Sequence, residues 1–281
     1  MTAPLFPLLH DGSAACVERI EFDTALQLAY DGTETATQIR DLPRVTISGT
    51  YKGTASGAGP VALALIQGGG LVQLPLGCHA ASVFAADALD FGINADAPLA
   101  IAGNNGGLFA SLAVPATSGF PAGAAWVAPS AEAWLANSRE IDWNGASPSW
   151  SAQLSFELTS GYREAVPALT GALTFPVAVL SDLKVSETRT AQQDKLDYNR
   201  VWLLSQRYIK RSVKLSIGIV GRTNIAAFRQ FIYACAGTLN RFTWQAPADS
   251  APGTWRLGAD ATELQYVTRG YVKVALELVQ I

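Results

Sequence analysis

Apolar and polar residues alternate along several stretches of this chain, and the alternation limits its fold more than any other feature. It is clearest in RVTISGTY (44–51), AQLSFELTS (152–160) and YVKVALELVQI (271–281). Successive side chains of a strand point to opposite faces, so a period of two predicts strands with one buried face, typically in antiparallel sheets. The 25 glycines and 14 prolines supply the turns that short strands require. The sequence therefore predicts a mainly β protein.

Helical periodicity is confined to short segments. The clearest is RTNIAAFRQFIYACAG (222–237), where Thr223 or Asn224 can cap the first turn and Gly237 can supply the left-handed residue that ends the helix. One face of this helix carries apolar residues at helical spacing, namely Ile225, Phe228, Ile232 and Cys235. A weaker helix is predicted for SAEAWLANS (130–138), with Ser130 as its cap.

The two halves of the chain share an order of segments, as an internal repeat would. In each half an apolar segment, an Asp-containing turn and a basic residue precede an alternating strand. Aligning Val45 with Val213 gives an offset of 168 residues (213 minus 45). An apolar or helical segment follows each strand, from Val61 to Gln67 in the first copy and from Ile225 to Cys235 in the second. Coincidence between two β domains is the alternative explanation.

This repeat predicts two related antiparallel β-barrel or sandwich domains, residues 1–85 and 151–281. Each domain includes one of the short helical or apolar segments. Residues 86–150 lie between them and are rich in Gly and Ala. We expect this region to be a small inserted β module, in which GNNGG forms a hairpin turn because Asn and Gly accept positive φ.

Charged residues make up only 15% of the chain, well below the usual quarter or so. This suggests that other protein covers part of the surface; a simply apolar β protein is the alternative. A net charge of −3 gives no overall basic field, and we predict no sequence-specific binding of nucleic acid. The segment QRYIKRSVK holds a basic cluster, which we expect to face a lumen or an acidic partner: Arg207, Lys210, Arg211 and Lys214.

Residues that could carry catalysis or hold a metal are scarce. Cys16, Cys78 and Cys235 are far apart and form no CxxC pair, which argues against a disulfide framework or a zinc site. His79 follows Cys78, but adjacent strand residues point to opposite faces. The carboxylates within 87–96 match no calcium or glycosidase pattern, and no G-x-S-x-G, Walker or H-E-x-x-H motif occurs. We predict no catalytic, cofactor-binding or metal-binding residue and no enzymatic activity.

We expect neither a secretory signal nor a membrane-spanning segment in this sequence. The stretch MTAPLFPLLHDG lacks the basic region of a secretory signal, and no apolar run has the length needed to span a membrane. Because no such run occurs, we expect no association with a membrane. The widely spaced cysteines fit assembly in a reducing cytosol.

Aromatic residues gather in FRQFIYACAGTLNRFTW (228–244). Phe228 lies on the apolar helix face with Phe231 beside it, and Phe242 and Trp244 share one face of the strand that follows. Aromatic side chains dominate the energetics of cores and interfaces. We predict these four residues as structural anchors, which fill either the core of one subunit or the seam between two.

Two motifs carry a resemblance to a known family. The turn DGTE (31–34), with Pro43 and Arg44 after it, is similar to an NGTEQR-like turn followed by a PR pair. The aromatic stretch resembles an F-x-x-F signature that continues through a glycine to an F-W pair; Phe228, Phe231, Gly237, Phe242 and Trp244 stand at those positions. Both patterns, and the middle stretch FPAGAAWVAPSAEAWL, resemble tail-tip proteins of bacteriophages with long, non-contractile tails.

The resemblance implies a distal tail or hub-like minor tail protein, a structural component of the tail tip or baseplate in the virion. Its tail-tube-like β domains would form a ring that continues the tail tube and links it to the hub and receptor-binding apparatus. The expected partners are copies of itself, the tail tube protein and hub or tip proteins, with a tape-measure protein as a further possible partner. Two tube-like domains per chain favour a ring of three chains over one of six. Assembly would take place in the cytoplasm of the bacterial host.

Two other classes of protein fit parts of the sequence. A carbohydrate-binding β module of a phage or bacterial surface protein would use some of the seven tryptophans. It predicts two or three coplanar aromatic side chains on one exposed face. A glycan-degrading enzyme would need two facing carboxylates at catalytic distance.

Overall fold

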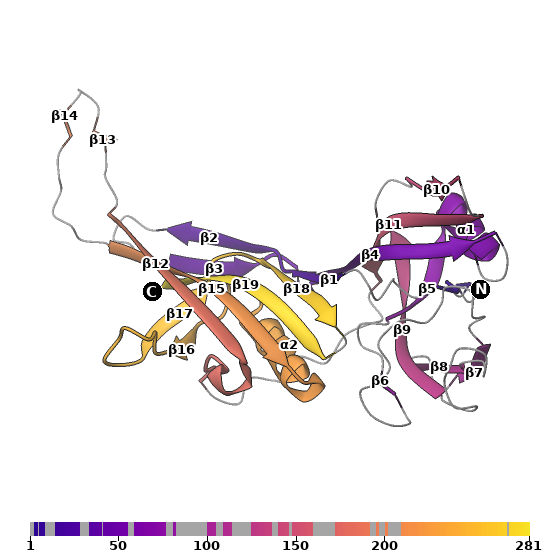
Figure 1. The fold of residues 1–281 in the computed structure, drawn as a ribbon. Coiled ribbons are helices and arrows are strands. Elements are labelled where there is room, and N and C mark those ends of the chain that lie inside the picture. Colours follow the sequence, from indigo (N-terminus) through magenta and orange to yellow (C-terminus); the bar gives the residue numbers. More distant parts are fainter. Residues whose placement is uncertain are drawn as a thin grey trace. The chain divides into compact units, whose positions relative to one another are not determined.

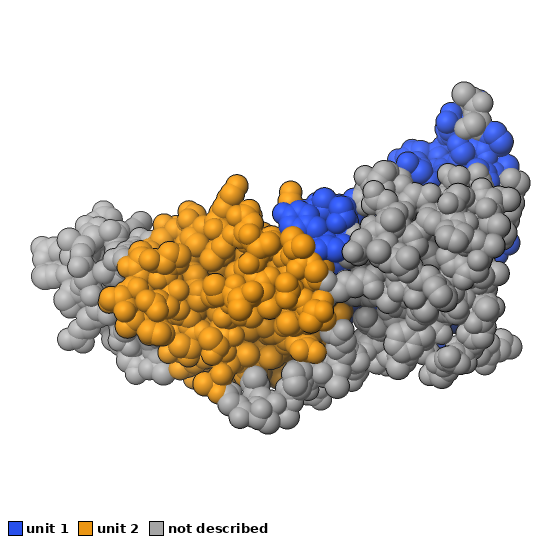
Figure 2. Space-filling model, turned by 60° about the horizontal axis from the view of Figure 1, so that its bottom comes forward, with its two compact units in different colours: residues 1–19, 44–164, 265–272 blue, residues 20–43, 165–264, 273–281 orange. Residues whose placement is uncertain are grey.

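The computed structural model describes most of the chain in two compact units. The described residues are 3–4, 6–8, 15–28, 34–40, 42–55, 59–76, 81–82, 100–104, 109–113, 125–136, 140–145, 148–159, 172–191, 195–196, 200–201, 209–268 and 270–281. Figure 2 colours the units: unit 1 comprises residues 1–19, 44–164 and 265–272, and unit 2 comprises residues 20–43, 165–264 and 273–281.

Each unit is assembled from three separate stretches of the chain, whereas the predicted domains 1–85, 86–150 and 151–281 are continuous segments. Much of the predicted inserted module, including 83–99 and 114–124, lies outside the described residues. The division into two related domains and an insertion therefore stays a prediction.

Unit 1 is built on a sheet of largely antiparallel strands, labelled in Figure 1. The strand order is β18 (Ala261–Thr268), β1 (Cys16–Glu21), β4 (Arg44–Thr54), β11 (Ser149–Leu158), β9 (Ala125–Leu135), β8 (Phe109–Ala113) and β7 (Ala100–Asn104). Of β18 and β1, residues 265–268 and 16–19 belong to unit 1, and the rest of each strand belongs to unit 2. Two further strands pair with β9, namely β5 (Leu71–Pro75) and β6 (Ala81–Ser82), and β10 (Asp142–Asn144) pairs with β11.

The core of unit 1 follows from the alternation in β4 and β11. Ile47 and Phe156 stand directly opposite each other and are 2% and 1% exposed. The Tyr51 ring packs edge-on against Phe6 and Phe156, with centroid distances of 5.4 and 5.6 Å. The prediction of half-buried antiparallel strands is confirmed here. The apolar segment predicted from Val61 to Gln67 is helix α1 (Gly59–Gly68).

The weaker helix predicted for residues 130–138 is wrong. Its first residues belong to β9, which pairs with β5, β8 and β11. Ala131 and Ala133 are buried whereas Glu132 and Trp134 are exposed, which is the period of a strand. Ala and Glu favour helices intrinsically, but pairing with neighbouring strands supplies backbone hydrogen bonds and burial that outweigh this preference.

Unit 2 contains a second set of strands, with helix α2 (Arg222–Cys235) packed against β15 (Ile209–Val220) (Figure 1). The strand order is β12 (Asp182–Ala191), β15, β19 (Tyr271–Gln280) and β18, and β17 (Gly253–Leu257) pairs with β19 and with β16 (Phe242–Trp244). The pairs β12–β15, β16–β17 and β17–β19 are antiparallel. The remaining elements are the hairpin of β2 (Thr24–Leu28) and β3 (Glu34–Gln38), the pair β13 (Lys195–Leu196) and β14 (Arg200–Val201), and the 3-10 helix η3 (Val177–Val179).

Helix α2 has the predicted apolar face. All four residues of that face are 5% exposed or less: Ile225, Phe228, Ile232 and Cys235. At the C-terminal end, two residues rather than one adopt the left-handed conformation, Ala236 with φ 49° and Gly237 with φ 66°. A Cβ atom at Gly237 would stand 2.7 Å from an Asp260 carboxylate oxygen, so this glycine also permits a close approach.

The predicted cap of α2, Thr223 or Asn224, lies two or three residues beyond the observed N-cap position, Gly221. The helix begins at Arg222 after Gly221 and has no side-chain cap, so Thr223 and Asn224 lie inside it. The Asn224 side-chain amide donates a hydrogen bond of 2.8 Å to the carbonyl of Val220. Because it donates backward along the chain, it does not accept from the free amides of the first turn as a capping residue would.

No sheet formed by the described strands closes into a barrel. The strand order of unit 1 ends at β7 and that of unit 2 at β12, so open edges remain. The mainly antiparallel β class is confirmed, and the barrel alternative is not realised in this part of the chain.

Candidate functional site

The four predicted aromatic anchors are buried together in unit 2, at 5% exposure or less: Phe228, Phe231, Phe242 and Trp244. The Phe231 ring centroid lies 5.2 Å from that of Phe242 and 5.4 Å from that of Phe175. Trp244 lies 5.3 Å from Trp255. The four anchors thus fill the core of unit 2 within a single chain. Sequence reasoning missed Phe175 and Trp255, because neither stands in a stretch with a clear period.

The predicted basic cluster does not act as one surface. Arg207 lies outside the described residues, as does the side chain of Lys210. Lys214 is exposed, but Arg211 is only 8% exposed. Residues 211 and 214 are three apart in a strand and so point to opposite faces. Arg211 is in phase with the buried Val213, which corrects the expectation that it faces a lumen or a partner.

Arg211 forms ion pairs with two carboxylates inside unit 2. Its guanidinium donates to Asp249 and Glu187, each at 2.8 Å, and lies over the Trp255 ring at 5.2 Å. The hydrogen bonds to Asp249 and then to Glu187 raise the pKa of Arg211 above its ordinary value. This arginine therefore fixes strands of the core and stays charged.

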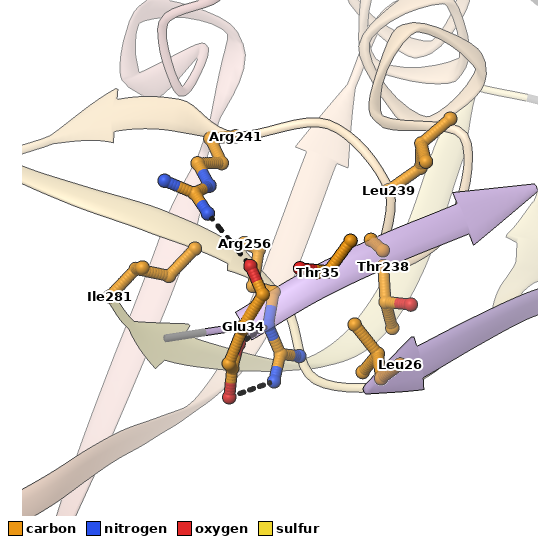
Figure 3. A pocket seen from close by; sticks show the side chains of 9 residues that line it. Leu26, Glu34, Thr35, Thr238, Leu239, Arg241, Arg256 and Ile281 are labelled. Atoms are coloured by element: carbon orange, nitrogen blue, oxygen red, sulfur yellow. Dashed lines mark hydrogen bonds and ion pairs between the residues drawn. The ribbon is translucent and has the colours of Figure 1, made fainter. Parts of the chain in front are cut away.

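A pocket of about 280 Å³ opens where the β2–β3 hairpin meets the segments around β16 and β17 (Figure 3). On β17, the Trp255 ring packs against Trp244, one of the four aromatic anchors. The adjacent Arg256 therefore points to the opposite face of the strand, toward the hairpin. Arg256 is 4% exposed and pairs with Glu34 through two hydrogen bonds, Nε to Oε2 at 2.7 Å and Nη2 to Oε1 at 3.0 Å. The exposed Arg241 donates to the Glu34 backbone carbonyl at 3.3 Å.

Asp260 joins the same hairpin to the end of α2. The backbone amides of Thr24 and Thr238 each donate to its carboxylate at 3.0 Å, and the Thr24 hydroxyl donates as well. Partial burial alone would raise the pKa of Asp260, but the hydrogen bonds from Thr24 and Thr238 outweigh it and lower the pKa below its ordinary value. Asp260 and Glu34 thus attach the hairpin at two points.

Replacing Asp260 by asparagine is expected to lower the free energy of unfolding by about 1.5–3 kcal/mol at neutral pH, because asparagine has no charge and offers one acceptor oxygen where the carboxylate offers two. Because the pKa of Asp260 is lower in the folded protein than in the unfolded chain, its carboxylate stabilises the fold at every pH above the unfolded-state pKa of about 3.9. That stabilisation disappears as the pH falls through the folded-state pKa. Urea unfolding of both proteins across acidic pH should show the difference shrinking; a difference independent of pH would contradict this role.

Strand β12 is a long edge strand. It pairs with β15 in unbroken register from Asp182↔Gly218 to Ala191↔Ile209, and no other described strand pairs with it. Val185 stands opposite the buried Leu215 yet is 39% exposed, so the apolar face of the sheet continues to its edge. Edge strands offer free backbone N–H and C=O groups to a further strand.

Unit 1 exposes two tryptophans among its described side chains, Trp134 at 51% and Trp143 at 59%. Trp134 stands opposite Glu157 and Trp143 opposite Trp150. Positions 157 and 150 of β11 differ by an odd number, so the two exposed rings belong to opposite faces of the sheet. They do not form the coplanar platform that carbohydrate binding predicts.

The described residues contain no group of three or more His, Cys, Asp and Glu side chains placed to hold a metal ion. Neither α1 nor α2, the helices of the described part, is long and apolar enough for a membrane span. No protein-family model and no curated protein matches the sequence.

Proposed function

We propose that this chain is a structural subunit of a bacteriophage tail tip, which forms a ring that continues the tail tube and links it to hub and receptor-binding proteins. The observation that carries this proposal is the open edge of β12, ten residues long in unbroken register. A ring needs a surface on each subunit that accepts the next one, and strand addition at such an edge provides it. The tail-tip motifs support the same class of protein.

A repeated order of elements supports two tube-like domains in one chain. In unit 1 strand β4 leads through α1 to β5, and in unit 2 strand β15 leads through α2 to β16. The aligned residues Val45 and Val213 are 4% and 0% exposed. With two such domains per chain, three chains supply six domains and so match a six-fold tube. We therefore expect a ring of three chains rather than six. The ring would be assembled in the host cytoplasm and carried in the virion.

The proposal is tested by measuring the mass of the purified protein in solution by native mass spectrometry and light scattering. We expect a closed ring of three chains. Val185→Lys should dissociate it without changing monomer melting, because a charge on an edge strand hinders strand addition. Val220→Lys is the matched control, since Val220 is also exposed, at 54%, but lies at the end of β15.

Three outcomes would count against the proposal. A protein that stays monomeric at high concentration and binds surface glycans would be a carbohydrate-binding module instead. Hydrolysis of those glycans would indicate the enzyme class. A ring that Val185→Lys leaves intact would show that β12 is not the contact between subunits.

A further inference from the structure

Strand β10 of unit 1 has an open edge, as strand β12 of unit 2 does. Among the described strands, β10 pairs only with β11, and β12 pairs only with β15 (Figure 1). Each of the two therefore has one side on which its backbone N–H and C=O groups can bind a further strand. Pairing β10 of one chain with β12 of another joins two different surfaces, and such head-to-tail contacts are the kind that form rings.

At each open edge, the inner face of the sheet leaves an apolar side chain uncovered. On β10, Trp143 stands opposite the buried Trp150 yet is 59% exposed. Ile141 precedes the strand, has the parity of Trp143 and is half-buried. On β12, Val185 stands opposite the buried Leu215 and is 39% exposed. A strand added at either edge removes this apolar surface from water, which is favourable.

The outer faces of the same two edges carry opposite charges. Asp142 on β10 is exposed, and so is Glu140 two residues before it. Lys184 on β12 and Lys214 on β15 are exposed as well. A serine stands opposite Asp142 on β11, and a serine stands opposite Lys184 on β15. Neither Asp142 nor Lys184 thus has an opposite charge directly across from it on a described strand, and an added strand can supply one.

We propose that β10 of one chain adds antiparallel to β12 of the next chain. Residues opposite each other in a sheet share a face, and one register matches both faces, with the pairs Asp142 and Lys184, Trp143 and Leu183, and Ile141 and Val185. Glu140 then stands opposite Ser186, and only this small side chain separates it from Lys214 on the following strand. The inference rests on the proposed ring and names the strand that β12 accepts.

Charge reversal tests the register, with the dissociation of the ring on dilution followed by light scattering. Asp142→Lys and Lys184→Asp should each raise the concentration at which half of the rings dissociate by roughly ten-fold or more, because like charges directly opposite each other repel. The double variant exchanges the two charges and should return to within about three-fold of the wild type. Glu132→Lys is the matched control, since it reverses an exposed carboxylate on β9, outside β10, and should leave the ring unchanged.

Mixing two blocked chains gives an independent test. A chain with Val185→Lys keeps only β10 available, and a chain with Asp142→Lys and Trp143→Lys keeps only β12 available. Each should be monomeric alone, with the melting temperature of the dilute chain little changed because the replaced side chains are exposed. An equal mixture should form a dimer with one copy of each, seen by native mass spectrometry.

The outcomes separate this inference from the proposed function. If rings form and Val185→Lys dissociates them, but Asp142→Lys does not weaken them, then β12 accepts another strand and only the pairing with β10 is overturned. A mixture of blocked chains that stays monomeric, or a double charge exchange that dissociates as readily as the single variants, overturns the pairing as well. A wild-type chain that stays monomeric overturns both the ring and the pairing.

Discussion

Phe231→Ala is expected to lower the free energy of unfolding by about 3–5 kcal/mol, the usual loss for a buried aromatic side chain. Phe231 is 5% exposed and its ring contacts those of Phe228, Phe242 and Phe175, at centroid distances of 6.0, 5.2 and 5.4 Å. Removing it leaves a cavity that rigid rings on three sides cannot readily fill. Urea unfolding followed by tryptophan fluorescence measures the loss.

Trp143→Ala is the matched control for this aromatic deletion. Trp143 is 59% exposed, so its removal should change the free energy of unfolding by no more than about 0.5 kcal/mol. If Phe231→Ala instead unfolded at the wild-type urea concentration while the oligomer dissociated, Phe231 would belong to a seam between subunits. The measurement thus tests the core position of Phe231, which is buried among aromatic rings of its own chain.

Local periodicity predicts much of the architecture, because burial of one face follows directly from residue spacing. The strands at 44–51 and 271–281 and the apolar face of α2 have the spacing that their burial requires. The same rule would have placed Arg211 inside, since it is in phase with Val213 and out of phase with Lys214. Grouping basic residues by nearness in sequence, without regard to strand parity, produced that error.

Other features depend on partners that no local pattern reveals. Ser130 begins a sequence with good helix formers, yet pairing of β9 with β5 and β11 makes this segment a strand. The pocket depends on Glu34 and Arg256, which are 222 residues apart. The turn motif drew attention to Glu34, but an arginine in a short strand looks like an ordinary solvated residue until its partner is known.

Glu34→Gln is expected to lower the free energy of unfolding by about 3–5 kcal/mol, because it leaves a buried guanidinium without its counter-charge. The Arg256 and Glu34 side chains are only 5% and 16% exposed, so water compensates less for a lost carboxylate here than it would at the surface. Glu157→Gln is the matched control. Its pair with Arg44 is 36% and 46% exposed, and such surface pairs contribute about 0–1 kcal/mol. Urea unfolding of both variants should separate them clearly.

The double variant Glu34→Leu with Arg256→Met separates the cost of an unpaired charge from the value of the ion pair. Replacing both partners of a buried pair by apolar side chains is often neutral or stabilising, whereas removing one partner is costly. We therefore expect the double variant to unfold at a higher urea concentration than Glu34→Gln. If it is instead less stable than Glu34→Gln, the two hydrogen bonds of the pair hold the β2–β3 hairpin by their geometry, and apolar contact cannot replace them.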